Sequence, residues 1–202
     1  MPTYKLTYFN VRGRGELIRL LFAAGGIPYE DVRIEWDKWP ELKSKTPMGQ
    51  VPTLEVDGQL MICQSMAIAR FVAREAGLLG KTSVDQARAD MLLDGGMDLG
   101  KLFTEMVMEK DASKKAEKKK EFGEKSLPPF LALYEGFAGG NGYFVGDSLT
   151  WADIAFFNMM DFITAEYPSA LDGYCNLNKV VDNVKTNPGV AKWLKERPVT
   201  DH

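Results

Sequence analysis

The chain has 202 residues, 45% of them apolar and 26% charged, with a formal net charge of −3. These are ordinary values for a globular protein in water, and the length allows one large domain or two small ones whose core needs no disulfide bonds. The slightly acidic balance argues against a general affinity for nucleic acid, and no apolar run reaches the roughly 18 residues of a membrane-spanning helix.

The first part of the chain carries strand and helix signals in alternation. Residues 3–9 are rich in Tyr, Thr and Phe and alternate in polarity, which predicts a strand. Apolar residues at helical spacing follow over 17–22, and the glycine pair at 25–26 ends that helix. A second strand is predicted over 29–35, whereas the Trp- and Pro-containing stretch 36–48 indicates an irregular loop with one helical turn.

A hairpin and a helix complete this part. An Asp-Gly dipeptide between two short strand patterns, 53–56 and 60–63, is a strong hairpin signal. A helix capped by Ser65 follows. Strand, helix, strand, hairpin and helix form the thioredoxin-like order, with the first two strands parallel and the hairpin antiparallel. We therefore predict an α/β domain of this kind over residues 1–78.

Beyond residue 80 the strand signals disappear and helical patterns replace them. The tetrapeptide 83–86 is interpreted as a capping box that opens a long helix, and 150–153 forms a second box. The pattern over 112–137 is also helical, although a Pro-Pro pair within it must kink or interrupt the helix. Two shorter helices are expected at 177–185 and 189–196.

The second part, 83–202, is therefore predicted to be an all-helical bundle domain. Its seven lysines between 110 and 125 alternate with acidic residues, which favours a solvated helix surface over a nucleic-acid patch. The glycine pair at 95–96 lies inside a helical pattern, where glycine costs about 1 kcal/mol against alanine. Such glycines often allow a neighbour or a ligand to approach the backbone closely.

The cysteines and the histidine exclude several kinds of chemistry. Cys63 and Cys175 form neither a CxxC pair nor a metal-ligand spacing, so we expect both to be reduced and buried in a cytoplasmic protein without a secretory signal. The single histidine, His202, is the last residue, where chains are usually mobile. Histidine-dependent triads and histidine-containing zinc sites are thereby excluded, so a nucleophile needs another activator or comes from a cofactor.

Several residues carry two interpretations each. By spacing alone Pro52 favours an edge strand with a trans bond, because only about 5–6% of X-Pro bonds are cis; the alternative is a cis bond that exposes the Val51 backbone. Ser65 is a simple helix cap or, alternatively, part of an anion site at a helix N-terminus. Tyr8 alone is a packing residue of a strand, and Arg14 alone a surface charge.

Six motifs taken together carry more information than any of them alone. They are YKLTYF at 4–9, RGR with a following Glu16 at 12–16, WPELK at 39–43, QVP at 50–52, QSMAIAR at 64–70 and LTWAD at 149–153. In this order, and over essentially the full chain, they resemble the sigma-class glutathione transferases. That class includes mollusc digestive-gland enzymes, cephalopod lens crystallins and glutathione-dependent prostaglandin D synthases. The resemblance implies a thioredoxin-like domain for glutathione, a helical domain for the second substrate, and a homodimer.

The resemblance also implies roles for single residues. Tyr8 would form a hydrogen bond to the glutathione sulfur, and Val51, beside a cis Pro52, would pair with the cysteinyl backbone. Asp98 would reach the γ-glutamyl amine from the other subunit. The other implied glutathione-site residues are Arg14, Trp39, Lys43 and Gln50, with Gln64 and Ser65 at the γ-glutamyl group. The candidates for the electrophile site are Phe9, Arg14, Ala155 and Met159.

The implied activity is conjugation of the glutathione thiolate to small hydrophobic electrophiles, as in detoxification. A free thiol has a pKa of about 8.5, so only a few per cent is thiolate at neutral pH. A hydroxyl that donates to the sulfur favours the charged form and lowers that pKa. The reaction requires neither metal nor histidine, which fits a chain whose single histidine is terminal.

Two other functions stay open: prostaglandin D synthesis, and a non-catalytic crystallin or carrier role. Gln50 stands where the prostaglandin synthases carry Lys, and Met97 stands where they carry an acidic residue, which argues against their magnesium site. The aromatic residue of their substrate pocket is replaced here by Glu105 or Thr104. Crystallin relatives tend to carry an insertion in the helical domain, and this sequence has none. Tyr8 and the other implied glutathione residues also argue for activity.

Overall fold

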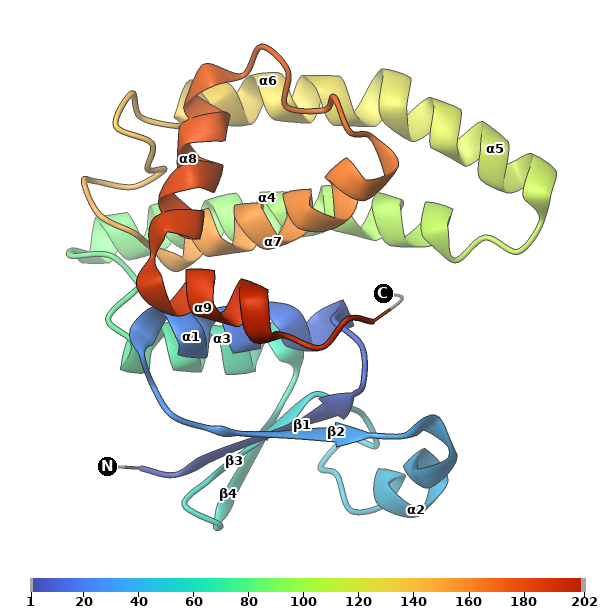
Figure 1. Cartoon of the computed structure of the whole chain (residues 1–202), viewed down its shortest axis with the longest axis vertical. Coiled ribbons are helices and arrows are strands. Elements are labelled where there is room, and N and C mark those ends of the chain that lie inside the picture. Colours follow the sequence, from blue (N-terminus) through green and yellow to red (C-terminus); the bar gives the residue numbers. More distant parts are fainter. Residues whose placement is uncertain (1, 201–202) are drawn as a thin grey trace. The chain divides into compact units, whose positions relative to one another are not determined.

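The computed structural model describes residues 2–200, which divide into two compact units (Figure 1). The first unit contains the chain up to Leu78 and again from Thr186 onward; the second contains Leu79–Lys185. The terminal histidine, His202, lies outside the described residues.

A four-stranded sheet forms the centre of the first unit. Its strands are β1 (Tyr4–Phe9), β2 (Glu30–Ile34), β3 (Thr53–Val56) and β4 (Leu60–Cys63), in the order β2-β1-β3-β4. β1 and β2 run parallel, and the β1–β3 and β3–β4 pairs are antiparallel, so the predicted thioredoxin-like order is confirmed. Leu6 lies opposite Leu54 on the central pair, and both side chains are fully buried.

Two helices of this unit cover one face of the sheet. They are α1 (Glu16–Gly25), which follows the short 3-10 turn η1 (Gly13–Gly15), and α3 (Ser65–Glu75). Their buried residues recur at helical spacing, which places one apolar stripe of each helix in the core. The stretch predicted as irregular, 36–48, is more ordered than expected: it contains the 3-10 turn η2 (Trp36–Lys38) and the short helix α2 (Trp39–Lys43).

The last helix, α9 (Pro188–Glu196), packs against α1 in the first unit. Its cap residue Asn187 accepts the N–H groups of Gly189 and Val190 at 3.0 and 3.1 Å and donates to the Ala24 carbonyl at 3.4 Å. A Cβ at Gly189 would lie 1.8 Å from the Ala23 oxygen, so this approach requires glycine. The sequence-based division had placed the helix in the bundle, because periodicity identifies a helix without identifying the core that it covers.

The regular secondary structure described in the second unit is helical. Its helices are α4 (Ser83–Val107), α5 (Ala112–Glu121), α6 (Leu127–Phe137), α7 (Trp151–Glu166) and α8 (Cys175–Thr186). The α4 and α7 helices lie side by side, and α5 and α6 form one long rod through the π-helical segment η3 (Phe122–Ser126) (Figure 1). The Pro-Pro pair does not interrupt the rod. It lies in the first turn of α6, where backbone N–H groups have no helical acceptor, so their absence in proline is tolerated. The π-helical segment η3 stands directly before this turn.

Of the two predicted capping boxes, the one at α7 is confirmed and the one at α4 begins one residue earlier than predicted. The box at the start of α4 is formed by Thr82 and Asp85, one residue earlier than predicted: Thr82 N–H donates to Asp85, and Asp85 N–H to the Thr82 hydroxyl, at 3.0 and 3.1 Å. The box at α7 is confirmed, with Asp153 accepting the N–H and the hydroxyl of Thr150 at 2.7 and 2.8 Å.

The glycine pair inside α4 admits a tyrosine. A Cβ at Gly95 would lie 2.9 Å from the hydroxyl oxygen of Tyr134, which reaches past the glycine to donate to the Leu92 carbonyl. The close approach expected at this pair is therefore made by a neighbouring side chain of the same unit.

Three surface expectations can be compared with the structure. Helix α5 buries none of its residues, and Lys118 and Lys119 form ion pairs with Glu109 and Glu166, as expected for a solvated charged helix. The prediction that both cysteines are buried is wrong: Cys63 is half-buried and Cys175 exposed, and both are free. No helix within residues 2–200 combines the length and the apolar character needed to cross a bilayer.

Candidate functional site

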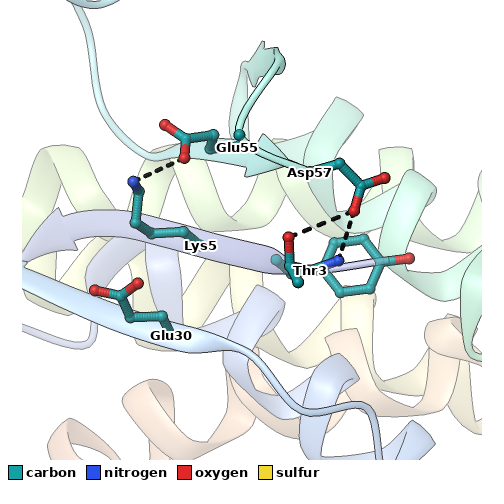
Figure 2. A pocket seen from close by; sticks show the side chains of 7 residues that line it. Thr3, Lys5, Glu30, Glu55 and Asp57 are labelled. Carbon is teal, nitrogen blue, oxygen red and sulfur yellow. Dashed lines mark hydrogen bonds and ion pairs between the residues drawn. The ribbon is translucent and has the colours of Figure 1, made fainter. Parts of the chain in front are cut away.

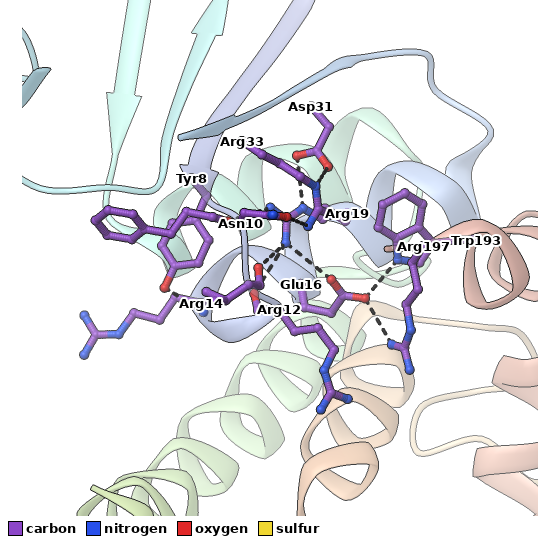
Figure 3. Close-up of polar contacts among 12 residues, drawn as sticks. Tyr8, Asn10, Arg12, Arg14, Glu16, Arg19, Asp31, Arg33, Trp193 and Arg197 are labelled. Atoms are coloured by element: carbon purple, nitrogen blue, oxygen red, sulfur yellow. Dashed lines mark hydrogen bonds and ion pairs between the residues drawn. The ribbon is translucent and has the colours of Figure 1, made fainter. Parts of the chain in front are cut away.

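Tyr8 stands near the end of β1, with its ring buried and its hydroxyl beside the turn η1. The Tyr8 Oη accepts the backbone N–H of Arg14 at 3.2 Å (Figure 3). Two glycines make this possible. A Cβ at Gly13 would lie 2.8 Å from that oxygen, and a Cβ at Gly15 would lie 2.7 Å from the ring; Gly13 also has a φ of +38°. Gly13 in the RGR motif and Gly15 just after it therefore let the turn fit closely around the tyrosine.

This contact determines the direction of the hydroxyl group. The Arg14 N–H occupies a lone pair of the oxygen, so the proton of the hydroxyl points elsewhere. Within residues 2–200 no protein acceptor takes that proton. Tyr8 thus keeps one hydrogen-bond donor for which the described residues provide no acceptor.

Aromatic contacts connect β1 to the segment with η2 and α2. The Phe9 ring stacks on Trp36 at 3.8 Å between centroids and meets Trp39 edge-on at 5.6 Å. Phe9 is therefore nearly enclosed by tryptophans, although its predicted role is contact with an electrophile. Tyr8, Phe9, Trp39 and Val51 all belong to one small apolar cluster, which positions the segment beside the tyrosine.

The loop before β3 contains the predicted cis bond. Val51-Pro52 is cis, so the interpretation taken from the resemblance is confirmed and the one from spacing alone is wrong. Gln50, just before it, accepts a hydrogen bond from the Gln64 side-chain amide at 3.2 Å. Lys43 is exposed and runs along Gly49, which brings an ammonium group to the same loop.

The N-terminus of α3 is a free set of donors. The cap position is occupied by Gln64, with a φ of +73°, and its side chain forms no capping hydrogen bond. The prediction that Ser65 caps the helix is wrong, because Ser65 is already its first helical residue. A positive φ in a residue other than glycine is uncommon and is found preferentially at functional sites. Uncapped N–H groups and the helix dipole together suit a carboxylate.

The remaining predicted residues fall into two groups. Arg14 is exposed, and Figure 3 shows its side chain on the Tyr8 side of the turn. Asp98, on α4, is exposed and belongs to the second unit. Ala155 and Met159 lie one turn apart on α7 of the same unit, both half-buried, and the Met159 sulfur also approaches Gly96.

Comparisons with known proteins agree with this geometry. The chain matches two family models, "Glutathione S-transferase, N-terminal domain" over residues 4–74 and "Glutathione S-transferase, C-terminal domain" over residues 97–197. It is 43% identical over 204 residues to the hematopoietic prostaglandin D synthase of Gallus gallus, with 99% of each chain covered. The chain belongs to the glutathione S-transferase family.

Two further relatives support the same family. Glutathione S-transferase 1 of Ascaris suum is 38% identical over 207 residues, with both chains fully covered. Among solved structures, rat hPGDS complexed with a quinoline superposes with a TM-score of 0.90 at 34% identity, covering 99% of this chain and 100% of the other.

Sequence reasoning missed one group of residues beside Tyr8, although a signal was present. Arg19 and Glu16 are buried in α1, and Arg19 interrupts the otherwise apolar run 17–22. A charge inside such a run indicates a buried polar partner, because an unpaired charge in the core is costly. Figure 3 shows these two residues among further arginines and Asp31.

A pocket at the other end of β1 has the wrong charge for the ligand of this family. It measures about 290 Å³ and is lined by Lys5, Glu30, Glu55 and Asp57 together with Thr3, Tyr4 and Gly58 (Figure 2). Lys5 is already paired with Glu55 at 2.7 Å, and Asp57 accepts the Thr3 N–H at 2.8 Å. Glutathione carries two carboxylates, so the acidic lining of this pocket does not suit it. Within residues 2–200, no three Asp, Glu, His or Cys side chains gather as metal ligands.

Proposed function

We propose that this chain is a glutathione S-transferase that joins the sulfur of glutathione to small hydrophobic electrophiles. The observation that carries the proposal is the arrangement of Tyr8, whose oxygen accepts the Arg14 N–H while its proton remains available. We also propose the sigma class, a cytoplasmic location and a detoxifying role. The ordered sequence motifs support the class, and two free cysteines suit a reducing compartment.

The chemistry follows from the hydroxyl group. Tyr8 donates its proton in a hydrogen bond to the glutathione sulfur, which stabilises the thiolate over the thiol and lowers the thiol pKa. A lowering of about two units corresponds to about 2.7 kcal/mol of preferential stabilisation. A lone pair of the thiolate then forms the carbon–sulfur bond, and the displaced electron pair leaves with the leaving group or moves to a neighbouring atom of the electrophile.

The rest of glutathione finds complementary groups in the first unit. The uncapped N-terminus of α3 at Gln64 and Ser65 suits the γ-glutamyl carboxylate. The Val51 backbone, beside the cis bond, suits the cysteinyl peptide group. At the glycine end, Lys43 supplies a cation for the second carboxylate and Trp39 an apolar wall. Arg14 and Gln50 complete the proposed site, and the electrophile is assigned to the second unit, near Ala155 and Met159.

The Tyr8→Phe variant tests this mechanism. Phenylalanine retains the ring and its packing but has no proton to donate, so the variant should fold and bind glutathione nearly as well. Its bound thiol should titrate at higher pH, followed by the ultraviolet absorbance of the thiolate, and most of the turnover with an aryl halide should be lost. An unchanged thiol titration in the variant would contradict the role given to Tyr8.

We further propose a homodimer in which Asp98 of the partner subunit completes each glutathione site. The γ-glutamyl ammonium needs a carboxylate when it is taken out of water. Asp98 lies exposed on α4, and helical spacing puts it on the same face as two apolar side chains that are also half or nearly half exposed, Met91 at 50% and Leu102 at 47%. Such a helix face is suited to burial against a second copy.

A mixed dimer distinguishes a shared site from a separate one. Tyr8→Phe and Asp98→Ala are purified separately, both homodimers are shown to be impaired, and differently tagged chains are then co-expressed. If Asp98 acts across the dimer, one site receives both changes and the other neither, so about half of the wild-type activity returns. If it acts within its own chain, each site keeps one change and no activity returns. Normal glutathione affinity in the Asp98→Ala homodimer would remove Asp98 from the site.

Prostaglandin D synthesis is a second candidate, favoured by the 43% identity to the Gallus gallus enzyme. Met97, beside Asp98, removes one acidic side chain from the place where those synthases would hold magnesium. We therefore expect slow conversion of prostaglandin H2 that magnesium barely affects. A panel assay with an aryl halide, an alkenal, a hydroperoxide and prostaglandin H2 compares the candidates directly. Rapid conversion stimulated by magnesium would favour the second.

A further inference from the structure

Arg19 is a fully buried cation that reaches the backbone directly after Tyr8. Its Nη1 donates to the Val11 carbonyl at 2.8 Å and, more weakly, to that of Arg12 at 3.5 Å; its Nη2 lies 3.5 Å from the Phe9 carbonyl. The planar fork of one guanidinium group thus holds three carbonyl groups of a four-residue stretch.

The same stretch leads into the turn that holds Tyr8. The N–H groups of Gly15 and Glu16 donate to the Arg12 carbonyl at 3.2 and 2.9 Å, and between them and Arg12 stands Arg14, whose N–H reaches the Tyr8 oxygen. The Arg19 guanidinium carbon also lies 5.9 Å from the centre of the Tyr8 ring. Arg19 therefore contacts both the ring of the tyrosine and the backbone that presents the donor to its hydroxyl.

Two carboxylates fix the orientation of Arg19. One carboxylate oxygen of Asp31, on β2, accepts a hydrogen bond from the Arg19 Nε at 3.0 Å. The other oxygen accepts a hydrogen bond from the Arg33 Nε at 2.8 Å. Glu16, one turn earlier on α1 and 1% exposed, lies 3.4 Å from Nη1.

Helix α9 holds Glu16 in its place. Trp193 donates its indole N–H to Glu16 at 2.9 Å, and Arg197, just after the helix, donates to the same oxygen at 3.1 Å (Figure 3). A continuous set of polar contacts thus connects the carboxyl-terminal helix with the turn at Tyr8.

We infer that Arg19 is a positioning residue for Tyr8, and that α9 maintains its orientation through Glu16. The inference rests on the proposed role of Tyr8 as donor to the glutathione sulfur. Because that donor must meet the sulfur at hydrogen-bond distance, a small displacement of the turn weakens thiolate stabilisation more than it weakens binding of the peptide. The charged groups around the site are Arg19, Glu16, Asp31, Arg33 and Arg197, with Arg12 and Arg14 on the turn itself.

The Arg19→Lys variant separates geometry from charge. Lysine retains the positive charge but has a single nitrogen, so it cannot hold the carbonyl groups as a fork. We expect the pKa of the bound glutathione thiol to rise by about one unit, and turnover at neutral pH to fall about tenfold, with the KM for glutathione nearly unchanged. A thiol titration like that of the wild type would overturn the inference.

Two further variants distinguish a positioning effect of Arg19 from a general loss of stability. Ile18→Val changes a fully buried neighbour on α1 and should lower the Tm by a few degrees without moving the thiol pKa. Trp193→Phe removes one hydrogen bond to Glu16 and should raise the thiol pKa by a smaller amount than Arg19→Lys. If Arg19→Lys does not fold, an unchanged titration in Trp193→Phe overturns the inference instead.

Failure of the proposed function gives a different result. If glutathione bound to the wild-type protein titrates like free glutathione, or if Tyr8→Phe titrates like the wild type, the role of Tyr8 is wrong. If both behave as expected while Arg19→Lys and Trp193→Phe titrate like the wild type, only the positioning role of Arg19 is wrong.

Discussion

Replacing Asp153 with asparagine should destabilise the helical unit by an amount that depends on pH. The carboxylate is fully buried and accepts three hydrogen bonds, from the Phe144 N–H at 2.8 Å and from the N–H and hydroxyl of Thr150 at 2.7 and 2.8 Å. An asparagine amide has one oxygen, so at least one buried donor loses its acceptor. The expected loss in the free energy of unfolding is about 1–3 kcal/mol.

The pH dependence follows from the ionisation of the same group. Burial raises the pKa of Asp153 from its ordinary 3.8 to about 6, although the hydrogen bonds from Phe144 and Thr150 act in the opposite direction. Because the folded pKa lies above the unfolded one, the stability gained from this group is complete below the unfolded pKa and is lost as the pH rises through 6. Asparagine does not titrate. The deficit of the variant should therefore shrink, by on the order of 1 kcal/mol, between about pH 5 and pH 7.

Urea unfolding of both proteins at pH 5, 6 and 7 measures this change. Asp147→Asn is the matched control, because Asp147 is exposed and Lys81 lowers its pKa. That carboxylate is ionised in the folded and unfolded states throughout this pH range, so the control should show a constant difference from the wild type. A deficit for Asp153→Asn that grows from pH 5 to pH 7 would refute the reasoning, since it would mean that the fold stabilises the carboxylate form.

A pair of glycine substitutions tests the packing inside α4, and a labelling reaction tests the exposure of the cysteines. Gly95→Ala places a methyl group 2.9 Å from the Tyr134 oxygen and should destabilise the protein by about 1–3 kcal/mol, whereas Gly96→Ala, with 3.8 Å of room, should be neutral or gain up to about 1 kcal/mol from helix propensity. Thermal unfolding of both variants measures this difference in stability. Equal changes in the Tm of Gly95→Ala and Gly96→Ala would contradict the structure. Cys175, which is exposed, should react with a thiol reagent faster than the half-buried Cys63, as timed mass spectrometry of the labelled protein would show.

Local signals in the sequence predicted most of the secondary structure. The strands and the hairpin were found because alternation and an Asp-Gly turn act between near neighbours. The capping box at Thr150 was found for the same reason, whereas the box at α4 was placed one residue late. Several candidate site residues, including Tyr8 and Gln64, depended instead on the resemblance of ordered motifs, because each of them has a commoner structural explanation when taken alone.

Sequence alone predicted the two-part organisation and carried the family resemblance. Only the tertiary structure decided which core α9 covers, and which side chains meet at Tyr8. The reason is that helical periodicity and capping are properties of neighbouring residues, whereas Glu16 and Trp193 stand far apart in sequence and meet only because α9 packs on α1. The charge of Arg19 within an apolar run is the signal that sequence reasoning missed, and the fold identifies its partners as two carboxylates and the backbone beside the tyrosine.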